Sequence, residues 1–149
     1  MLRYACFPYH KWHVHAMSDI SENIVAHIKS GDDNLGNHTI PFHGEYKWGF
    51  CNRFDGKTLS YGYFWWGSKH QELALFDTKV TTICAVPAFT NFDCYWSVWP
   101  TGFYVSASNT SLGDHSWVFI KNWGWNYFWL IYFLYHVKHD INTLINLDV

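Results

Sequence analysis

Aromatic side chains at alternating positions constrain the fold of this chain more than any other feature of its sequence. Phe, Trp and Tyr make up 21% of the 149 residues. In the segment GEYKWGF, Tyr46, Trp48 and Phe50 share one face of an extended chain, while Glu45 and Lys47 share the other. Because aromatic and β-branched side chains suit the half-buried surface of a sheet, this pattern favours an all-β domain over a helical bundle.

Strand-like segments recur along most of the chain and are separated by short turns. KWHVHAM and DCYWSVW alternate in the same way, and NIVAHIK, KTLSYGYFWW and GFYVSAS are further candidate strands, while QELALFD is expected to run into a loop. About seven or eight such strands predict a small antiparallel β-sandwich, immunoglobulin-like or closely related, over residues 11–125. The side chains expected in its core are Trp12, Tyr46, Trp48, Phe50, Trp96 and Tyr104.

Residues 126–149 form a hydrophobic tail whose pattern differs from the rest of the chain. The apolar stretch from Trp123 to Val137 is about fifteen residues long, whereas a membrane-spanning helix needs about twenty. A stretch extended back to Trp117 reaches that length but includes Lys121, Asn122 and Asn126, so we do not expect a membrane span. An extra buried strand or helix and a tail created by misread coding sequence both stay open.

Charge and motif content argue against several functional classes. Ten basic and twelve acidic residues give a net charge of −2 without a basic stripe, so no nucleic-acid partner is expected. Because the chain contains no Gly-x-Ser-x-Gly elbow, phosphate-binding loop or HExxH motif, we expect neither an enzyme nor a bound cofactor. The first twelve residues lack the apolar run of an export signal.

Two segments suggest metal sites and were tested by spacing. SGDDNLGNHT resembles a calcium loop, but neither Asp32 nor Asp33 has the glutamate that an EF-hand requires at position 12. Asp, Asn and Gly are typical turn formers, so this segment predicts a polar turn. His13 and His15 share one strand face, but no further ligands stand at suitable spacings, so we expect no metal there.

Three other features bear on compartment and ligand. The four cysteines contain no CxxC pair, which gives no zinc or redox motif. The sequons at Asn37 and Asn109 suit a secreted glycoprotein and place both residues on the surface. Trp65 and Trp66 point to opposite faces of a strand, so one is expected in the core while the other is a candidate for stacking on a sugar or a protein. A carbohydrate-binding sandwich is therefore one alternative function.

Three segments in order carry a family resemblance: KWHVHAMSDISENIVAHIKSGDDNLGNHTI, GEYKWGFCNRFDGKTLSYGYFWWG and CYWSVWPTGFYVS. Together they resemble the plant self-incompatibility S-protein family, the S-protein homologues, over roughly residues 11–125. The matching positions are Ser30, Asp32, Asp33, Leu35, Gly36, Glu45, Tyr46, Trp48, Phe50, Thr58, Leu59, Cys94, Trp96, Gly102, Phe103 and Tyr104.

The resemblance implies a secreted, non-enzymatic ligand in cell–cell signalling that is recognised by a cell-surface receptor, as in the rejection of self pollen. We expect a monomer that contacts its partner through loops, which a rigid sheet scaffold holds in place. The candidate loops are 30–38, 52–57 and 77–93, and the candidate partner-binding residues are Asp32, Asp33, Asn34, Arg53, Asp55 and Lys79.

The chain departs from the family pattern at its cysteines. Ile28 and Gly62 stand where the family has cysteines, and their joint loss implies that the two positions are partners. The resemblance pairs Cys84 with Cys94 and leaves Cys6 and Cys51 as expected free thiols. Losing a native disulfide costs a small secreted domain about 2–5 kcal/mol, which leaves a degenerate, non-functional copy as an alternative. A protein tethered to a membrane through 117–137 is the last alternative.

Overall fold

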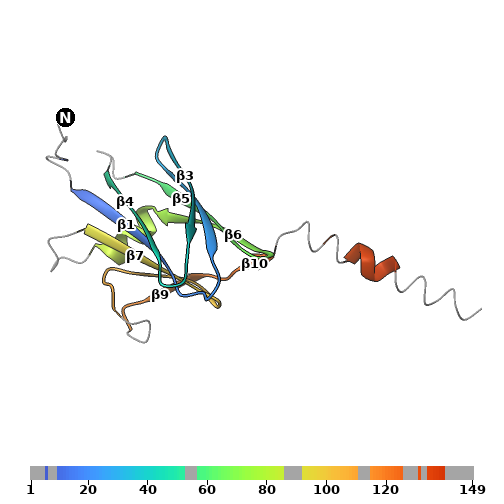
Figure 1. Cartoon of the computed structure of the whole chain (residues 1–149). Coiled ribbons are helices and arrows are strands. Elements are labelled where there is room, and N and C mark those ends of the chain that lie inside the picture. The colour runs from blue at the N-terminus through green and yellow to red at the C-terminus, as the bar shows by residue number, and fades with distance from the viewer. Residues whose placement is uncertain are drawn as a thin grey trace, which may run out of the picture.

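The computed structural model describes residues 6, 10–52, 57–85, 92–110, 115–125, 131 and 134–139. Over these residues, ten strands form two five-stranded sheets that pack face to face (Figure 1). The all-β sandwich predicted from the aromatic alternation is confirmed.

The strands are divided between the sheets as follows. Sheet A has the order β4-β1-β7-β8-β9, and sheet B has the order β10-β6-β5-β2-β3. The strands of sheet A are β1 (Lys11–Ser18), β4 (Glu45–Cys51), β7 (Phe92–Trp99), β8 (Gly102–Ser106) and β9 (Val118–Lys121). Those of sheet B are β2 (Ile24–Ser30), β3 (Asp33–Ile40), β5 (Ser60–Trp66), β6 (Lys69–Phe76) and β10 (Gly124–Trp125).

One pair of neighbouring strands is parallel. β1 and β7 run side by side in the same direction, with Trp12 opposite Phe92 and Ser18 opposite Val98. This pair is the exception to the antiparallel pairing that the sequence predicted for the sandwich. Parallel neighbours need a long crossover connection, and here the chain between β1 and β7 builds four strands of sheet B and also β4 of sheet A.

The core follows the alternation in the sequence with one exception. Trp12, Trp48 and Trp96 are buried, at 4%, 7% and 0% exposure, and Tyr46 and Phe50 pack against this core while partly exposed. Burying an aromatic side chain of this size contributes about 1.5–3 kcal/mol, so the three tryptophans account for much of the stability of the sandwich.

Tyr104 is the exception, and its predicted place in the core is wrong. The inward positions of β8 belong to Phe103 and Val105, which are fully buried. Tyr104 lies on the outer face of the sheet, where its ring contacts Phe119 of β9 at 5.3 Å between centroids.

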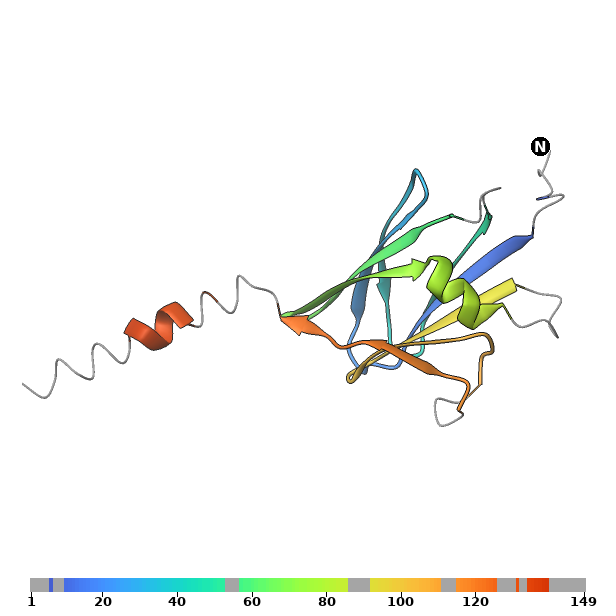
Figure 2. The same cartoon turned by 180° about the vertical axis from the view of Figure 1, so that it is seen from behind.

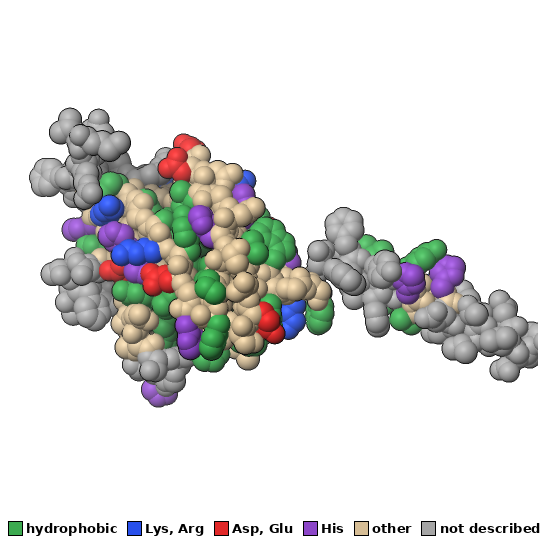
Figure 3. Space-filling view, viewed as in Figure 1, with side chains coloured by type: hydrophobic (Ala, Val, Ile, Leu, Met, Phe, Trp, Pro, Cys, Tyr) green, Lys and Arg blue, Asp and Glu red, His purple; other side chains and the backbone are tan. Residues whose placement is uncertain are grey.

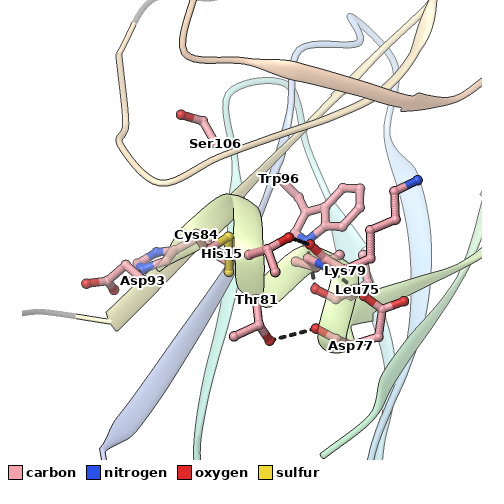
Figure 4. The surroundings of a disulfide bond; sticks show 12 residues. His15, Leu75, Asp77, Lys79, Thr81, Cys84, Asp93, Trp96 and Ser106 are labelled. Atoms are coloured by element: carbon pink, nitrogen blue, oxygen red, sulfur yellow. Dashed lines mark hydrogen bonds and ion pairs between the residues drawn. A yellow bond between two sulfur atoms is a disulfide. The ribbon is translucent and has the colours of Figure 1, made fainter. Parts of the chain in front are cut away.

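A short helix, α1 (Thr78–Cys84), occupies part of the segment that the sequence predicted as a loop. Asp77 caps it, because its Oδ1 accepts a hydrogen bond of 2.7 Å from the Val80 backbone N–H. Val80 and Cys84 face the core, and a disulfide joins Cys84 to Cys94 of β7 (Figure 4). The helix covers one end of the sandwich, beside β6, β7 and β8 (Figure 2).

Cys6 and Cys51 form a second disulfide, so the expectation of two free thiols is wrong. The pairing of β1 with β4 explains this bond. Lys11, the first residue of β1, lies opposite Cys51, the last residue of β4. The start of β1 is therefore next to Cys51. The Cα atoms of Cys6 and Cys51 are 5.4 Å apart, which is within the usual range for a disulfide.

The described part of the tail is helical at residues 131 and 134–139, and its side chains are exposed (Figure 1). No helix in the described part of the chain combines the length and the apolar character needed to cross a membrane.

Candidate functional site

Ionisable side chains gather on the outer face of sheet A, over β4, β1 and β7. Figure 3 shows this gathering as neighbouring blue, purple and red side chains. The alternation that turns Trp12 and Val14 into the core turns Lys11, His13 and His15 to this face. Glu45 and Lys47 of β4 and Asp93 of β7 join them from the two neighbouring strands, and the whole group is named here the His15 cluster.

His15 lies at the centre of the cluster between two carboxylates. Its Nδ1 is 2.6 Å from Oε1 of Glu45, and its Nε2 is 2.8 Å from Oδ1 of Asp93. The ring is buried, and it stacks on Tyr95 with 4.3 Å between centroids. Because a carboxylate only accepts, the imidazole can donate to both only when both its nitrogens carry protons. The arrangement therefore places one imidazole ring between two carboxyl groups that come from two different strands.

The surroundings of the cluster shift the pKa of two neighbouring side chains, His13 and Tyr95. Burial lowers the pKa of His13 from its ordinary 6.5, and the nearby Asp93 opposes this shift. Burial, assisted by Asp93 and Glu45, raises the pKa of Tyr95. A histidine whose pKa falls on folding binds protons less readily in the folded state. Its contribution to stability is therefore complete above pH 6.5 and is lost as the pH falls through its folded pKa.

Replacing His15 by glutamine is expected to lower the free energy of unfolding by about 1–2 kcal/mol at pH 6. The amide carries one donating group and one oxygen, so it cannot place a donor toward both carboxylates at once, and its oxygen faces one of them. Urea unfolding measures the effect. His13→Gln serves as the control, because His13 is more exposed and its Nδ1 is 4.0 Å from Asp93, and it should cost less. An equal loss from both variants would contradict the central place of His15.

The predicted partner-binding residues lie on different elements. Asp32 lies in the two-residue turn between β2 and β3. Asp33 and Asn34 belong to β3 itself, so the prediction that these two residues lie in a loop is wrong. All three side chains are exposed. Gly31 allows the tight turn, because its φ of 58° is open to glycine at little cost. Lys79 is exposed on α1 rather than in a loop.

Four predicted site residues remain, two for partner binding and two for glycosylation. Arg53 and Asp55 lie outside the described residues. Asn37 and Asn109 are both exposed.

Spacing along the chain did not point to the His15 cluster as a whole, because its carboxylates come from positions 30 and 78 residues away from His15.

Both ring nitrogens of His15 lie within hydrogen-bond distance of a carboxylate oxygen. Within the described ranges, no group of three or more His, Cys, Asp or Glu residues could hold a metal ion. What the surface does offer is a flat array of both charge signs, fixed on the strands of a rigid sheet.

Two disulfides, a two-layer sandwich and an ionised outer face define a small disulfide-stabilised β-sandwich of the kind found in extracellular proteins. Residues 13–126 match the sequence model of the family described as plant self-incompatibility protein S1. The chain belongs to this family, and the resemblance seen in its motifs is confirmed.

Two related proteins are similar to this chain. S-protein homolog 5 of Arabidopsis thaliana is 31% identical over 80 residues, which are 53% of this chain and 57% of that protein. The chain therefore matches little more than half the length of this relative. A solved structure of SPH proteins, described as small, highly stable, secreted proteins from plants, covers 78% of this chain and 97% of its own. With a TM-score of 0.55 at 13% identity, it supports the fold.

Proposed function

We propose that this chain is a secreted, non-enzymatic signalling ligand that a cell-surface receptor protein recognises through the outer face of sheet A. The observation that carries the proposal is His15, which lies between Glu45 and Asp93 with Lys47 opposite it on β4. A fixed array of both charge signs favours binding to a complementary protein surface, because charge complementarity selects partners and speeds association.

Family membership supports the location and the class of this function. The SPH proteins with the similar fold are described as secreted, and disulfides of the kind seen here persist in oxidising compartments. The β2–β3 hairpin, with Asp32 and Asp33 at its tip, supplies a second candidate contact, which includes residues predicted from the sequence to bind the partner.

Charge reversal on the sheet should weaken binding to the cell surface. The full chain is produced with a cleavable export signal, labelled, and titrated onto intact plant cells, with and without prior protease treatment of those cells. We expect saturable, protease-sensitive binding that Lys47→Glu weakens about tenfold or more, because it places like charges at the interface.

Lys138→Glu is the matched control, since it makes the same charge change at an exposed position in the tail, outside the sandwich. Equal weakening by both variants would indicate a general charge effect and would contradict recognition through sheet A. Binding that survives protease treatment would contradict a receptor protein. A loss with Asp32→Lys alone would move the site to the β2–β3 hairpin.

A further inference from the structure

A straight row of side chains crosses the outer face of sheet B from its edge inward. Asn37 on the edge strand β3 lies opposite His27 of β2, His27 lies opposite Tyr63 of β5, and Tyr63 lies opposite Glu72 of β6. Since neighbouring strands are about 4.8 Å apart, Tyr63 is roughly 10 Å from Asn37 along this row, and Glu72 roughly 14 Å.

The first member of the row is placed for modification. Asn37 is exposed and belongs to the sequon Asn37-His38-Thr39. Its Oδ1 lies 2.6 Å from Nδ1 of His27, which donates the hydrogen bond. This bond uses the amide oxygen and leaves Nδ2, the atom that carries an N-linked sugar, available. The bond also fixes the amide beside β2 and so limits the directions in which an attached sugar can extend.

The inner part of the row is suited to sugar rings. Tyr63 is half-buried, its ring meets that of His27 edge-on, and the exposed rings of Tyr61 and Trp65 flank it along β5. A pocket of about 300 Å³ lies at this end, lined by Tyr61, Tyr63, Glu72, Leu73, Ala74 and Lys121. Such a surface combines aromatic faces with a carboxylate and an ammonium group, which match the apolar faces and the hydroxyl groups of a sugar.

We propose that an oligosaccharide linked to Asn37 lies back across sheet B, packs on His27 and Tyr63, and ends in the pocket beside Glu72. The first two sugar rings of an N-linked chain span about two strand spacings, so they reach from Asn37 to Tyr63. The glycan covers the outer face of sheet B, and the outer face of sheet A stays open for a protein partner. The bound sugars stabilise the folded chain, because they contact sheet B only when β3, β2 and β5 are paired.

The test separates the glycan from the asparagine that carries it. Thr39→Ala removes the sequon but keeps Asn37 and its bond to His27, whereas Thr39→Ser keeps the sequon. Both variants are made with and without Tyr63→Thr. All chains also carry Asn109→Gln, which removes the second sequon and leaves Asn37 as the acceptor. The chains are secreted from plant cells, and three quantities are measured: glycan occupancy by peptide mass, Tm, and the rate of glycan release by a peptide N-glycosidase.

We expect an occupied Asn37 and a Tm about 2–4 °C higher for Thr39→Ser than for Thr39→Ala. Tyr63→Thr should reduce this gap to within about 1 °C and make release several-fold faster. Tyr104→Thr, on the opposite face of the sandwich, should change neither result.

Two results would overturn the proposal. One is a secreted chain in which Asn37 carries no glycan, and the other is a Tm gap that does not depend on Tyr63. If Tyr63→Thr lowers the yield of folded chain, Glu72→Ala makes the same test at the exposed end of the row. It should speed release without changing the Tm of the Thr39→Ala chain.

Discussion

Introducing cysteines at both position 28 and position 62 is expected to raise the free energy of unfolding by about 2–4 kcal/mol under oxidising conditions. Ile28 and Gly62 are direct partners across β2 and β5 and both are buried. Directly opposed residues of antiparallel strands have Cα atoms about 4.5–5.5 Å apart, within the range for a disulfide. The structure thus supports the expectation, drawn from the family resemblance, that these two positions belong together.

The residues now at these positions form a large–small pair that fills the same space. Ile28 is fully buried. A Cβ added at Gly62 would lie 2.5 Å from Cε2 of Phe64 and 2.6 Å from Cδ1 of Leu75, so these side chains have closed over the glycine. Both must shift to admit a cysteine, which offsets part of the gain from the bridge.

Urea unfolding of the double variant and of the natural chain, each with and without a reductant, separates the two contributions, because the reductant also opens the Cys6–Cys51 and Cys84–Cys94 bonds of both chains. The oxidised double variant should unfold at a higher urea concentration than the natural chain, and the reduced one at a lower concentration, because it keeps the crowding and has lost the isoleucine. Gly62→Cys alone is the control for crowding and should destabilise in both conditions. A double variant that retains free thiols after oxidation would contradict the partnership of these positions.

The inward faces of the strands were predictable because alternation is a local property of the sequence. Cys94, Trp96 and Val98 lie on one face in the alternating pattern, and all three are buried. The parallel pairing of β1 with β7 was not predictable in this way. It depends on where the chain returns after building most of sheet B, and no feature within either strand specifies its neighbour.

Two of the wrong predictions, the loop over Asp33 and Asn34 and the loop over α1, concern segments whose sequences carry a sign of the observed structure. Gly31-Asp32 between two extended runs is typical of a two-residue hairpin, a reading that would have placed Asp33 and Asn34 in a strand. Asp77 before Thr78 is a typical N-cap, although seven residues give too little helical periodicity to recognise α1. The Cys6–Cys51 bond required the register of β1 against β4, which single segments do not contain.

The candidate site was predictable only in part. Alternation placed His13 and His15 on one face, as the structure shows. The partners of His15 come from two other strands, and a carboxylate at a distant position has no special spacing that marks it as a partner. Topology, rather than local pattern, therefore creates the His15 cluster.

Trp96→Ala is expected to lower the free energy of unfolding by about 3–5 kcal/mol, the loss typical of deleting a large aromatic side chain from a core. Trp96 is fully buried beside the Cys84–Cys94 disulfide, and its Nε1–H donates a hydrogen bond of 2.9 Å to the backbone oxygen of Leu75 (Figure 4). The indole thus links β7 of sheet A to β6 of sheet B. Its removal leaves both a cavity and a buried carbonyl without its partner, and the second effect accounts for about 1–3 kcal/mol of the total.

Against a total of about 5–15 kcal/mol for a natural domain, this loss is a large share of the free energy of unfolding. Urea unfolding of the secreted protein measures it. Trp125→Ala is the matched control, because that indole is 63% exposed, and it should cost no more than about 1 kcal/mol. Trp96→Phe keeps most of the ring volume and should fall between the two. If Trp96→Ala were as mild as Trp125→Ala, the two sheets would not depend on this side chain for their packing.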